Sequence, residues 1–266
     1  MVPVVEELKT VPSPADALRA FAGDDGLVLF ESALQRGRLG RYSFLTADPI
    51  ATFEVERATF GYDPFASVRE TLSELNDHFN FQPLADLPPF QGGVAGILSY
   101  ELGACWERTP RPGEDEFQLP DAWFGIYDWV IAWDHHQDRA WVLSHGLPAR
   151  MPRNASTTSE AVNNPDRHGC QDRAAIRIRH VLARLDAVIA QPGPCIDQFS
   201  NLPASKLAVQ YGLPGWDGVT TDFTRSQYLA AAERVIEYTR AGDIFQANLA
   251  QRLLARCDLP PTELYH

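Results

Sequence analysis

The sequence predicts an α+β fold, in which antiparallel-rich β-sheets pack against helices. Short apolar runs bounded by tight turns indicate strands with local connections, and four longer segments have the caps or the spacing of helices. With 266 residues and 45% apolar side chains, the chain has enough apolar surface to fill a sizeable core. This composition excludes a disordered chain.

The first residues predict one short helix and three strands. Ser13 can cap a helix because its side chain accepts backbone N–H groups, and Pro14 suits the first helical position. A turn cluster at residues 23–26 ends this helix. The strands that follow are short and separated by turns, and they cover residues 27–30, 42–45 and 51–55.

The next segment predicts a helix that lies on a sheet and a glycine-bearing strand. The helix begins after Asp63-Pro64 and has one apolar stripe, formed by Phe65, Val68, Leu72, Leu75 and Phe79. Gly92, Gly93 and Gly96 accompany a strand over residues 94–100. Their spacing is not that of a phosphate-binding loop and no lysine follows, which favours close backbone packing or a bulge.

Residues 123–133 and 139–144 predict a hairpin around a turn that contains His135 and His136. A solvent-facing turn is favoured over a metal site for these two histidines. The aromatic side chains of the first strand could stack on nucleic-acid bases, but an acidic chain without interleaved lysine or arginine favours core packing.

Two irregular segments flank another predicted helix. Residues 151–169 are polar and aperiodic, typical of a surface linker. Residues 171–190 are amphipathic, and the arginines on their polar side (Arg173, Arg177 and Arg184) are expected to be solvated. Because a long irregular connection follows, we predict a domain over residues 1–190, a connecting loop over 191–222 and the start of a second domain over 223–266.

Residues 224–254 predict a helix, a tight stop and a strand. Thr224 and Gln227 form a capping box, and Gly242 suits a left-handed C-terminal cap. In the strand from Phe245 to Leu253, alternation places Gln246, Asn248 and Arg252 on one face. This polar face is either the solvated side of an edge strand or a wall that faces a bound anion.

Composition excludes several classes of function. The formal charge of −12 argues against a general nucleic-acid or anionic-membrane surface. We see neither a signal peptide nor an apolar run long enough to span a membrane. Cys105, Cys170, Cys195 and Cys257 form no C-x-x-C motif, so reduced thiols in a cytoplasm are expected.

Three blocks of sequence carry a family resemblance. Residues 87–103, LPPFQGGVAGILSYELG, and residues 119–129, which include LPD and GIYDW, look like the N-terminal region of aminodeoxychorismate synthase component I. Residues 242–252, GDIFQANLAQR, are similar to the first motif of its chorismate-binding region. Anthranilate synthase component I has the same architecture, so the resemblance implies a sandwich of that type.

The resemblance implies amination of chorismate with ammonia to 4-amino-4-deoxychorismate, on the route to para-aminobenzoate and folate. It also implies a magnesium ion on the substrate carboxylate and a glutamine amidotransferase subunit that supplies the ammonia. The chain shows no nucleophile motif of its own for glutamine hydrolysis, since its cysteines lack the required elbow.

Gln246 is the expected catalytic position, with Asn248 and Arg252 as expected substrate-binding residues. Related enzymes that add water to chorismate have a lysine general base at the place of Gln246, and a neutral amide cannot deprotonate water. Gln246 therefore favours the ammonia-using branch. Its alternative role is to bond a neighbouring backbone group, and Arg252 could instead form a partly buried ion pair.

The family also has a tryptophan pocket in its N-terminal region. The matching positions here are Glu31, Ser32, Arg41, Tyr42, Ser43 and Phe44. The serines offer hydrogen bonds and the aromatic side chains offer walls, so L-tryptophan is an expected ligand. Alternatively, these residues end two strands and fill the core.

The family's acidic metal ligands and its lysine-bearing catalytic motif should follow Arg252, but residues 260–264 look like a helix that has only begun. We therefore expect a fragment, inactive by itself. Anthranilate synthase component I is the nearest alternative function, and a non-catalytic module that binds tryptophan or an amidotransferase is another.

Overall fold

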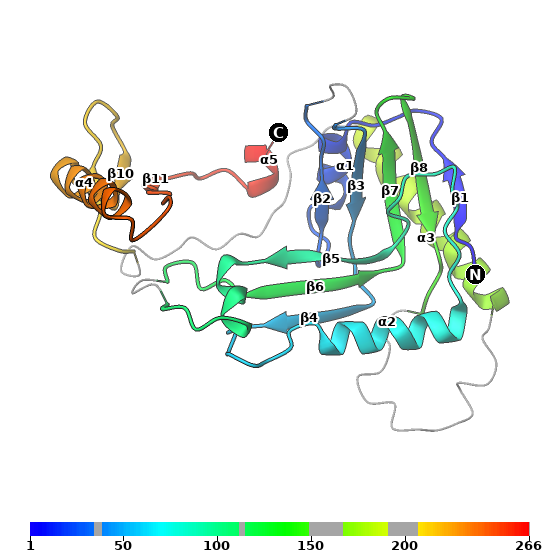
Figure 1. Ribbon diagram of the computed structural model, residues 1–266. Helices are drawn as coiled ribbons and strands as arrows, with labels where there is room; N and C mark the ends of the chain where they lie inside the picture. Colours follow the sequence, from blue (N-terminus) through cyan, green and yellow to red (C-terminus); the bar gives the residue numbers. More distant parts are fainter. Residues whose placement is uncertain (35–38, 112–114, 149–166, 191–206, 266) are drawn as a thin grey trace. The chain divides into compact units, whose positions relative to one another are not determined.

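The computed structural model describes residues 1–34, 39–111, 115–148, 167–190 and 207–265, and the chain divides into two compact units (Figure 1). Unit 1 contains Met1–Arg111, Leu119–Gln198 and Pro260–His266, and unit 2 contains Pro112–Gln118 and Phe199–Leu259. Within the described ranges, none of the helices has the length and apolar character that a membrane span needs. The domain limits at residues 190 and 222 stay a prediction.

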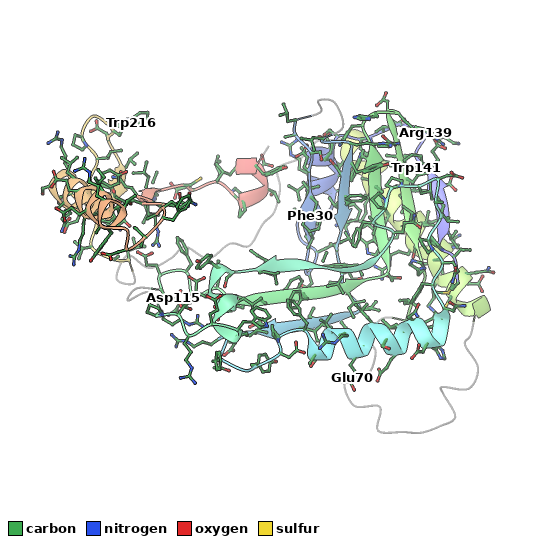
Figure 2. All side chains as sticks on the ribbon, in the orientation of Figure 1. Phe30, Glu70, Asp115, Arg139, Trp141 and Trp216 are labelled. Atoms are coloured by element: carbon green, nitrogen blue, oxygen red, sulfur yellow. The ribbon has the colours of Figure 1, made fainter. Side chains whose placement is uncertain are left out.

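A five-stranded antiparallel sheet forms the larger part of unit 1 (Figure 1). Its order is β1-β8-β7-β3-β2, with β1 at Val4–Glu7, β8 at Arg139–Ser144, β7 at Trp129–Asp134, β3 at Tyr42–Thr46 and β2 at Val28–Phe30. The hairpin predicted around residues 134–138 is confirmed as β7 and β8. On β8, Arg139 lies beside Trp141, with its guanidinium 4.7 Å from the ring centroid, and it also pairs with Glu7 of β1 at 2.7 Å (Figure 2).

A second sheet has three antiparallel strands that run across those of the first (Figure 1). Its order is β4-β6-β5, with β4 at Ala51–Val55, β6 at Ala122–Tyr127 and β5 at Gly93–Leu98. The single strand predicted over residues 123–133 is therefore wrong. The chain passes from β6 of one sheet to β7 of the other at the buried Asp128, a corner of the kind that joins packed sheets.

The glycine-bearing strand packs closely against its neighbour, as predicted. Gly96 lies opposite Phe124 in the register of β5 and β6, and a Cβ atom at this position would clash with the carbonyl oxygen of Trp123. Any larger residue would push the two strands apart.

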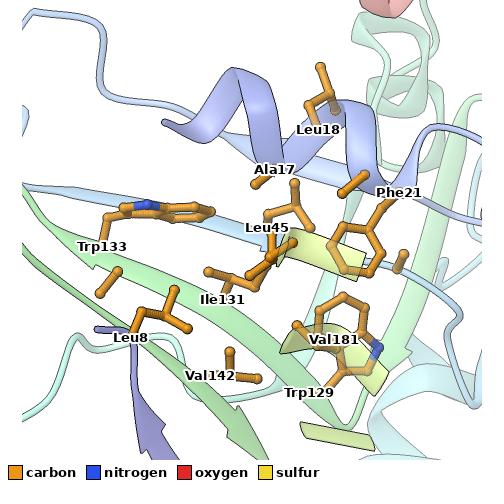
Figure 3. Packing of buried hydrophobic residues seen from close by; sticks show 14 of the residues in the cluster. Leu8, Ala17, Leu18, Phe21, Leu45, Trp129, Ile131, Trp133, Val142 and Val181 are labelled. Atoms are coloured by element: carbon orange, nitrogen blue, oxygen red, sulfur yellow. The ribbon is translucent and has the colours of Figure 1, made fainter. Parts of the chain in front are cut away.

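Two helices cover one face of the five-stranded sheet (Figure 3). Ser13 caps α1, Pro14–Phe21, by accepting a hydrogen bond from the Asp16 N–H at 3.0 Å. The other helix, α3, spans Arg167–Ala190. Together with the sheet they bury a core that includes Phe21, Leu45, Trp129, Ile131, Trp133, Val142 and Val181.

The described residues of unit 1 form three further helical segments. They are α2 at Ala66–Phe79, the 3-10 helix η1 at Tyr100–Cys105 and α5 at Pro261–Tyr265. Helix α2 packs against the three-stranded sheet. Its predicted stripe is confirmed at Val68, Leu75 and Phe79, which are buried, but Leu72 is exposed.

The arginines of α3 are not simply solvated, contrary to the prediction. Arg177 pairs with Asp48 at 2.7 Å, and Arg184 pairs with Asp24 at 2.6 Å while its guanidinium covers the Phe21 ring at 4.4 Å. The aspartates belong to turns distant in sequence, so spacing along one helix could not reveal them. These pairs fasten α3 to the loops that precede β2 and β4.

In unit 2, the described residues form one helix and a small antiparallel sheet. Helix α4, Arg225–Ala241, has the predicted capping box of Thr224 and Gln227 and ends at Gly242 in the left-handed conformation. None of its side chains is buried. The sheet has the order β11-β10-β9, with β11 at Leu253–Ala255, β10 at Val219–Thr221 and β9 at Tyr211–Gly212.

Two expectations for this region are wrong. The connection predicted as irregular over residues 191–222 contains β9 and β10 in its described part. The strand predicted from Phe245 forms only at β11, where β10 supplies hydrogen-bonding partners. Residues 244–252 have no neighbouring strand in the described part of the chain. Alternating polar and apolar side chains do not give the backbone N–H and C=O groups the hydrogen-bonding partners that a strand needs.

Candidate functional site

The residues of the expected tryptophan pocket meet at the end of β2 and the start of β3. The Ser32 N–H donates to the Ser43 hydroxyl at 3.0 Å, and the Ser32 hydroxyl donates to the Tyr42 carbonyl at 2.7 Å. Ser43 is fully buried, and its hydroxyl lies 2.6 Å from Nε2 of His135. A polar network of two hydroxyls and one imidazole therefore joins β2, β3 and the β7–β8 turn.

An ion pair borders this network. Arg41 binds Asp134 through Nε and Nη2, with a shortest distance of 2.6 Å, and its guanidinium lies 4.8 Å from the Tyr42 ring centroid. The hydrogen bonds from Arg41 hold the pKa of the Asp134 carboxyl below its ordinary value. Burial lowers the pKa of His135, which favours the neutral imidazole beside Ser43.

The aromatic members lie on the other face of β3. The rings of Tyr42 and Phe44 are 6.2 Å apart, and Phe44 meets Phe90 edge-on at 5.7 Å. Phe44 and Phe90 pack against a buried cluster of β7 and β8, so they also fill core space, as the alternative interpretation holds. Binding of an indole by these residues stays a prediction.

Glu31 lies at the exposed edge of the group. Its carboxylate accepts a hydrogen bond from the Tyr265 hydroxyl, which raises the pKa of Tyr265 to about 12. A second contact, between Arg19 of α1 and Glu263 at 3.6 Å, also holds α5 in unit 1. Helix α5 therefore ends beside the expected pocket.

Asp134, His135 and Tyr265 are members of this site that sequence reasoning missed. Asp134 and His135 join the site because β3 pairs with β7, which sets Tyr42 opposite Asp134. Local patterns showed both strands but not that they are neighbours. Tyr265 is more than two hundred residues from Glu31 in sequence, and no local pattern could have joined them.

The residues of the expected chorismate site lie in unit 2. Gln246 and Asn248 are exposed and belong to the segment that is not a strand. Arg252 precedes β11 and forms an ion pair with Glu116, whose side chain is only 1% exposed. The structure therefore confirms the ion-pair alternative for Arg252, although its own side chain is 43% exposed and can still meet a solute.

Three contacts fix the position of Arg252. Besides its ion pair, its guanidinium lies 5.6 Å from the Phe117 ring centroid, and its backbone N–H donates to Asp222 at 3.0 Å. Glu116 is itself held by the N–H of Ala208 at 2.9 Å. The arrangement can present a cation at a fixed place, but by itself it holds no acid or base for proton transfer.

No magnesium site is present among these residues. In the part of the chain that the structure describes, no group of three or more His, Cys, Asp or Glu side chains is arranged to hold a metal ion. The buried carboxylate nearest the expected substrate residues, Glu116, is paired with Arg252. The described residues therefore do not fit the implied ion.

Known proteins with similar sequences are first components of two synthases, and a matching family is described by its binding of chorismate. Residues 28–266 match the family described as chorismate binding enzyme. The chain is 29% identical over 268 residues to anthranilate synthase component 1 of Streptomyces coelicolor, which covers 100% of this chain and 45% of that protein. It is 27% identical over 251 residues to aminodeoxychorismate synthase component 1 of Bacillus subtilis, covering 90% and 44%.

A solved structure is similar as well. Anthranilate synthase component I of Streptococcus pneumoniae superposes with a TM-score of 0.51 at 19% identity, covering 88% of this chain and 46% of that one. At this identity the likeness shows the fold alone, and it confirms the predicted α+β sandwich. The chain spans about half the length of the curated relatives that it matches. Because the family match covers most of the chain, this protein belongs to the chorismate binding enzyme family.

Proposed function

We propose that the chain is part of component I of an aminodeoxychorismate synthase, which aminates chorismate with ammonia to 4-amino-4-deoxychorismate. Family membership and the relative from Bacillus subtilis support the substrate and this branch. The observation that carries the choice of ammonia over water is the identity of residue 246.

Gln246 has a neutral amide, which can donate and accept hydrogen bonds but cannot act as a general base. Addition of water to chorismate needs such a base, whereas ammonia is already a nucleophile. In this proposal Gln246 orients the substrate or ammonia from an exposed segment, while Arg252, held by Glu116, binds a substrate carboxylate.

Anthranilate synthase component I is the second candidate, because the relative from Streptomyces coelicolor has that name and its alignment covers the whole chain. Both candidates use the same substrate and ammonia. They differ in which ring carbon receives the nitrogen and in whether pyruvate is eliminated, so the identity of the product separates them.

The proposal includes a glutamine amidotransferase as the partner and the cytoplasm as the location. The relatives are named component 1, and this name implies a second component. Magnesium belongs to the proposal only through the family. The described residues offer this ion no ligand set.

Replacing Gln246 by alanine tests the proposal in the full-length gene product, supplied with chorismate and ammonium. We expect Gln246→Ala to lower kcat by at least about tenfold, because the variant loses the stabilisation of about one hydrogen bond to the reacting groups. Chromatography of the products identifies the branch.

Gln251→Ala is the matched control, because this nearby amide bonds the Thr221 hydroxyl at 2.8 Å. It should leave the kinetics close to those of the wild type. Unchanged turnover in Gln246→Ala would remove the proposed role of this residue, and formation of isochorismate would show that water is the nucleophile.

A further inference from the structure

Residues 115–118 form a turn that packs in unit 2, although Arg111 before it and Leu119 after it belong to unit 1. Asp115 closes this turn by accepting a hydrogen bond from the Gln118 N–H at 3.2 Å (Figure 2). Short polar side chains commonly hold the backbone of a turn in this way. A segment from the first half of the chain therefore presents Glu116 and Phe117 to unit 2 in a fixed conformation.

Both carboxylate oxygens of Glu116 are engaged inside unit 2. Oε1 accepts a hydrogen bond from the Ala208 N–H at 2.9 Å, and Oε2 pairs with Nη1 of Arg252. The Glu116 side chain is only 1% exposed, and a buried carboxylate is costly without an opposite charge beside it. The buried partner therefore dictates where the more exposed one, Arg252, can lie.

Phe117 restricts Arg252 in a second direction. The guanidinium lies over the Phe117 ring, 5.6 Å from its centroid, which is within the range of a cation–π contact. The backbone N–H of Arg252 is held as well, because it donates to Asp222 at 3.0 Å. One face of the guanidinium, its Nη1 and the backbone from which it projects are therefore all fixed.

The opposite edge of the Arg252 guanidinium, formed by Nε and Nη2, meets no acceptor among the residues that the structure describes. The side chain is 43% exposed, so a solute can reach this edge. Arg41 shows what such an edge binds, since its Nε and Nη2 both donate to the Asp134 carboxylate, at 3.0 and 2.6 Å. Two parallel donors match the two oxygens of a planar carboxylate.

The ion pair also changes the electrostatics of the site. Glu116 cancels the charge of Arg252, so the pair has little attraction for anions at long range. A ligand then gains mainly from the two short hydrogen bonds, which depend on geometry. The site therefore favours a carboxylate that fits the exposed edge over an anion that is attracted by charge alone.

We propose that Glu116 is a positioning residue of the substrate site: by holding Nη1, it turns the Nε and Nη2 edge of Arg252 toward one carboxylate of the substrate. The inference rests on the proposed function for the identity of that substrate, chorismate. It adds that the contact is bidentate, so that a lysine cannot replace Arg252, and that residues 115–118 are part of the site.

The first test needs no activity. The heteronuclear NOE of the Arg252 Nε–H group, assigned through Arg252→Lys, reports whether this side chain is held in the 266-residue chain. We expect a value close to that of the ordered backbone in the wild type, and the value of a mobile side chain in Glu116→Gln. Phe117→Leu, at an exposed position, should also loosen Arg252 while the buried carboxylate stays in place. Asp258→Asn is the matched control, because it breaks an exposed pair with Arg256.

The second test is kinetic and uses the full-length gene product. Glu116→Gln should raise the KM for chorismate about three to tenfold with little change in kcat, because a carboxylate contact is made alike in the ground state and the transition state. Arg252→Lys retains the charge but loses the paired donors, so it should raise KM at least about tenfold. Asp258→Asn should retain the KM of the wild type.

A double-mutant cycle separates positioning from a general effect on the fold. If Glu116 acts through Arg252, Glu116→Gln should raise KM no further in an Arg252→Gln background. A merely structural role would add its own loss there. The Kd of chorismate, measured by calorimetry, should follow the same order as KM, so a protein without turnover still tests the role.

An ordered Arg252 side chain in both Glu116→Gln and Phe117→Leu would overturn the positioning role. An unchanged or lower KM in Glu116→Gln, or its full effect in the Arg252→Gln background, would overturn it as well. A wild-type KM in Arg252→Lys would remove the bidentate contact. Anthranilate as the product would contradict the proposed function and leave the role of Glu116 intact.

Discussion

At the scale of the residue, the informative side chains are buried polar groups whose neighbours come from distant segments. Ser32 and Ser43 were singled out from the sequence, but His135, which lies against the Ser43 hydroxyl, was assigned to an ordinary turn. Residue type and spacing can show that a hydroxyl is available. They cannot show which side chain a neighbouring strand will place against it.

His145 gives a residue-scale prediction about pH. Its pKa is about 4 when folded, against about 6.5 in an unfolded chain, so between these values only the unfolded state binds the proton. The free energy of unfolding should therefore fall by about 3 kcal/mol as the pH drops from about 6.5 to about 4. Urea unfolding at a series of pH values measures this slope.

His145→Asn removes the titrating group, and its stability should depend less on pH over the same range. His136→Asn, at an exposed position of the β7–β8 turn, should retain the wild-type slope. A wild-type slope in His145→Asn would show that burial does not hold this imidazole neutral.

At the scale of the element, prediction succeeded where the signal was local. The caps of α1 and α4 and the apolar stripe of α2 depend on residues within a few positions of each other, and the structure confirms them. Prediction from the sequence failed where the formation of a strand depended on a neighbouring strand. The break at Asp128 and the irregular segment after Gly242 both follow from which strands are available to pair.

The capping box of α4 gives the element-scale prediction. This helix buries no side chain, so its own end groups contribute a large share of its stability. Thr224→Ala should destabilise α4 by about 1 kcal/mol, visible as faster amide exchange in its first turn. Thr224→Ser retains the hydroxyl and should behave as the wild type does.

Glu233→Ala changes an exposed residue in the middle of the same helix and serves as a second control. If Thr224→Ala and Thr224→Ser frayed the helix equally, the methyl group rather than the hydroxyl would be responsible. The cap would then contribute nothing measurable.

At the scale of the whole molecule, the two units differ in how much they bury. Among the residues that the structure describes, unit 1 has four apolar clusters, which include Trp129, Trp133 and Trp141, whereas Trp216 of unit 2 is 67% exposed. Composition predicted a sizeable core but could not say how it would be shared between segments. That division depends on long-range packing.

Hydrogen exchange of the 266-residue chain tests this difference. Amides of β7 and β8 should exchange only through global unfolding of unit 1. Amides of α4 should exchange through local opening, so their protection factors should be at least about a hundredfold lower than those of β7 and β8. Helix α1 is a demanding control, because it is shorter than α4 but buries Ala17, Leu18, Ala20 and Phe21. Equal protection in α1 and α4 would contradict the prediction.

The passage of the chain from β6 to β7 has a consequence for synthesis on the ribosome. The strands β1, β4 and β5 find all their partners among β6, β7 and β8, and before residue 122 only β2 and β3 can pair. Strands β1, β4 and β5 must therefore wait without partners until residues 122–144 leave the exit tunnel. A pause in translation soon after β5 would prolong this exposed state, and one placed after β8 would allow both sheets to close together.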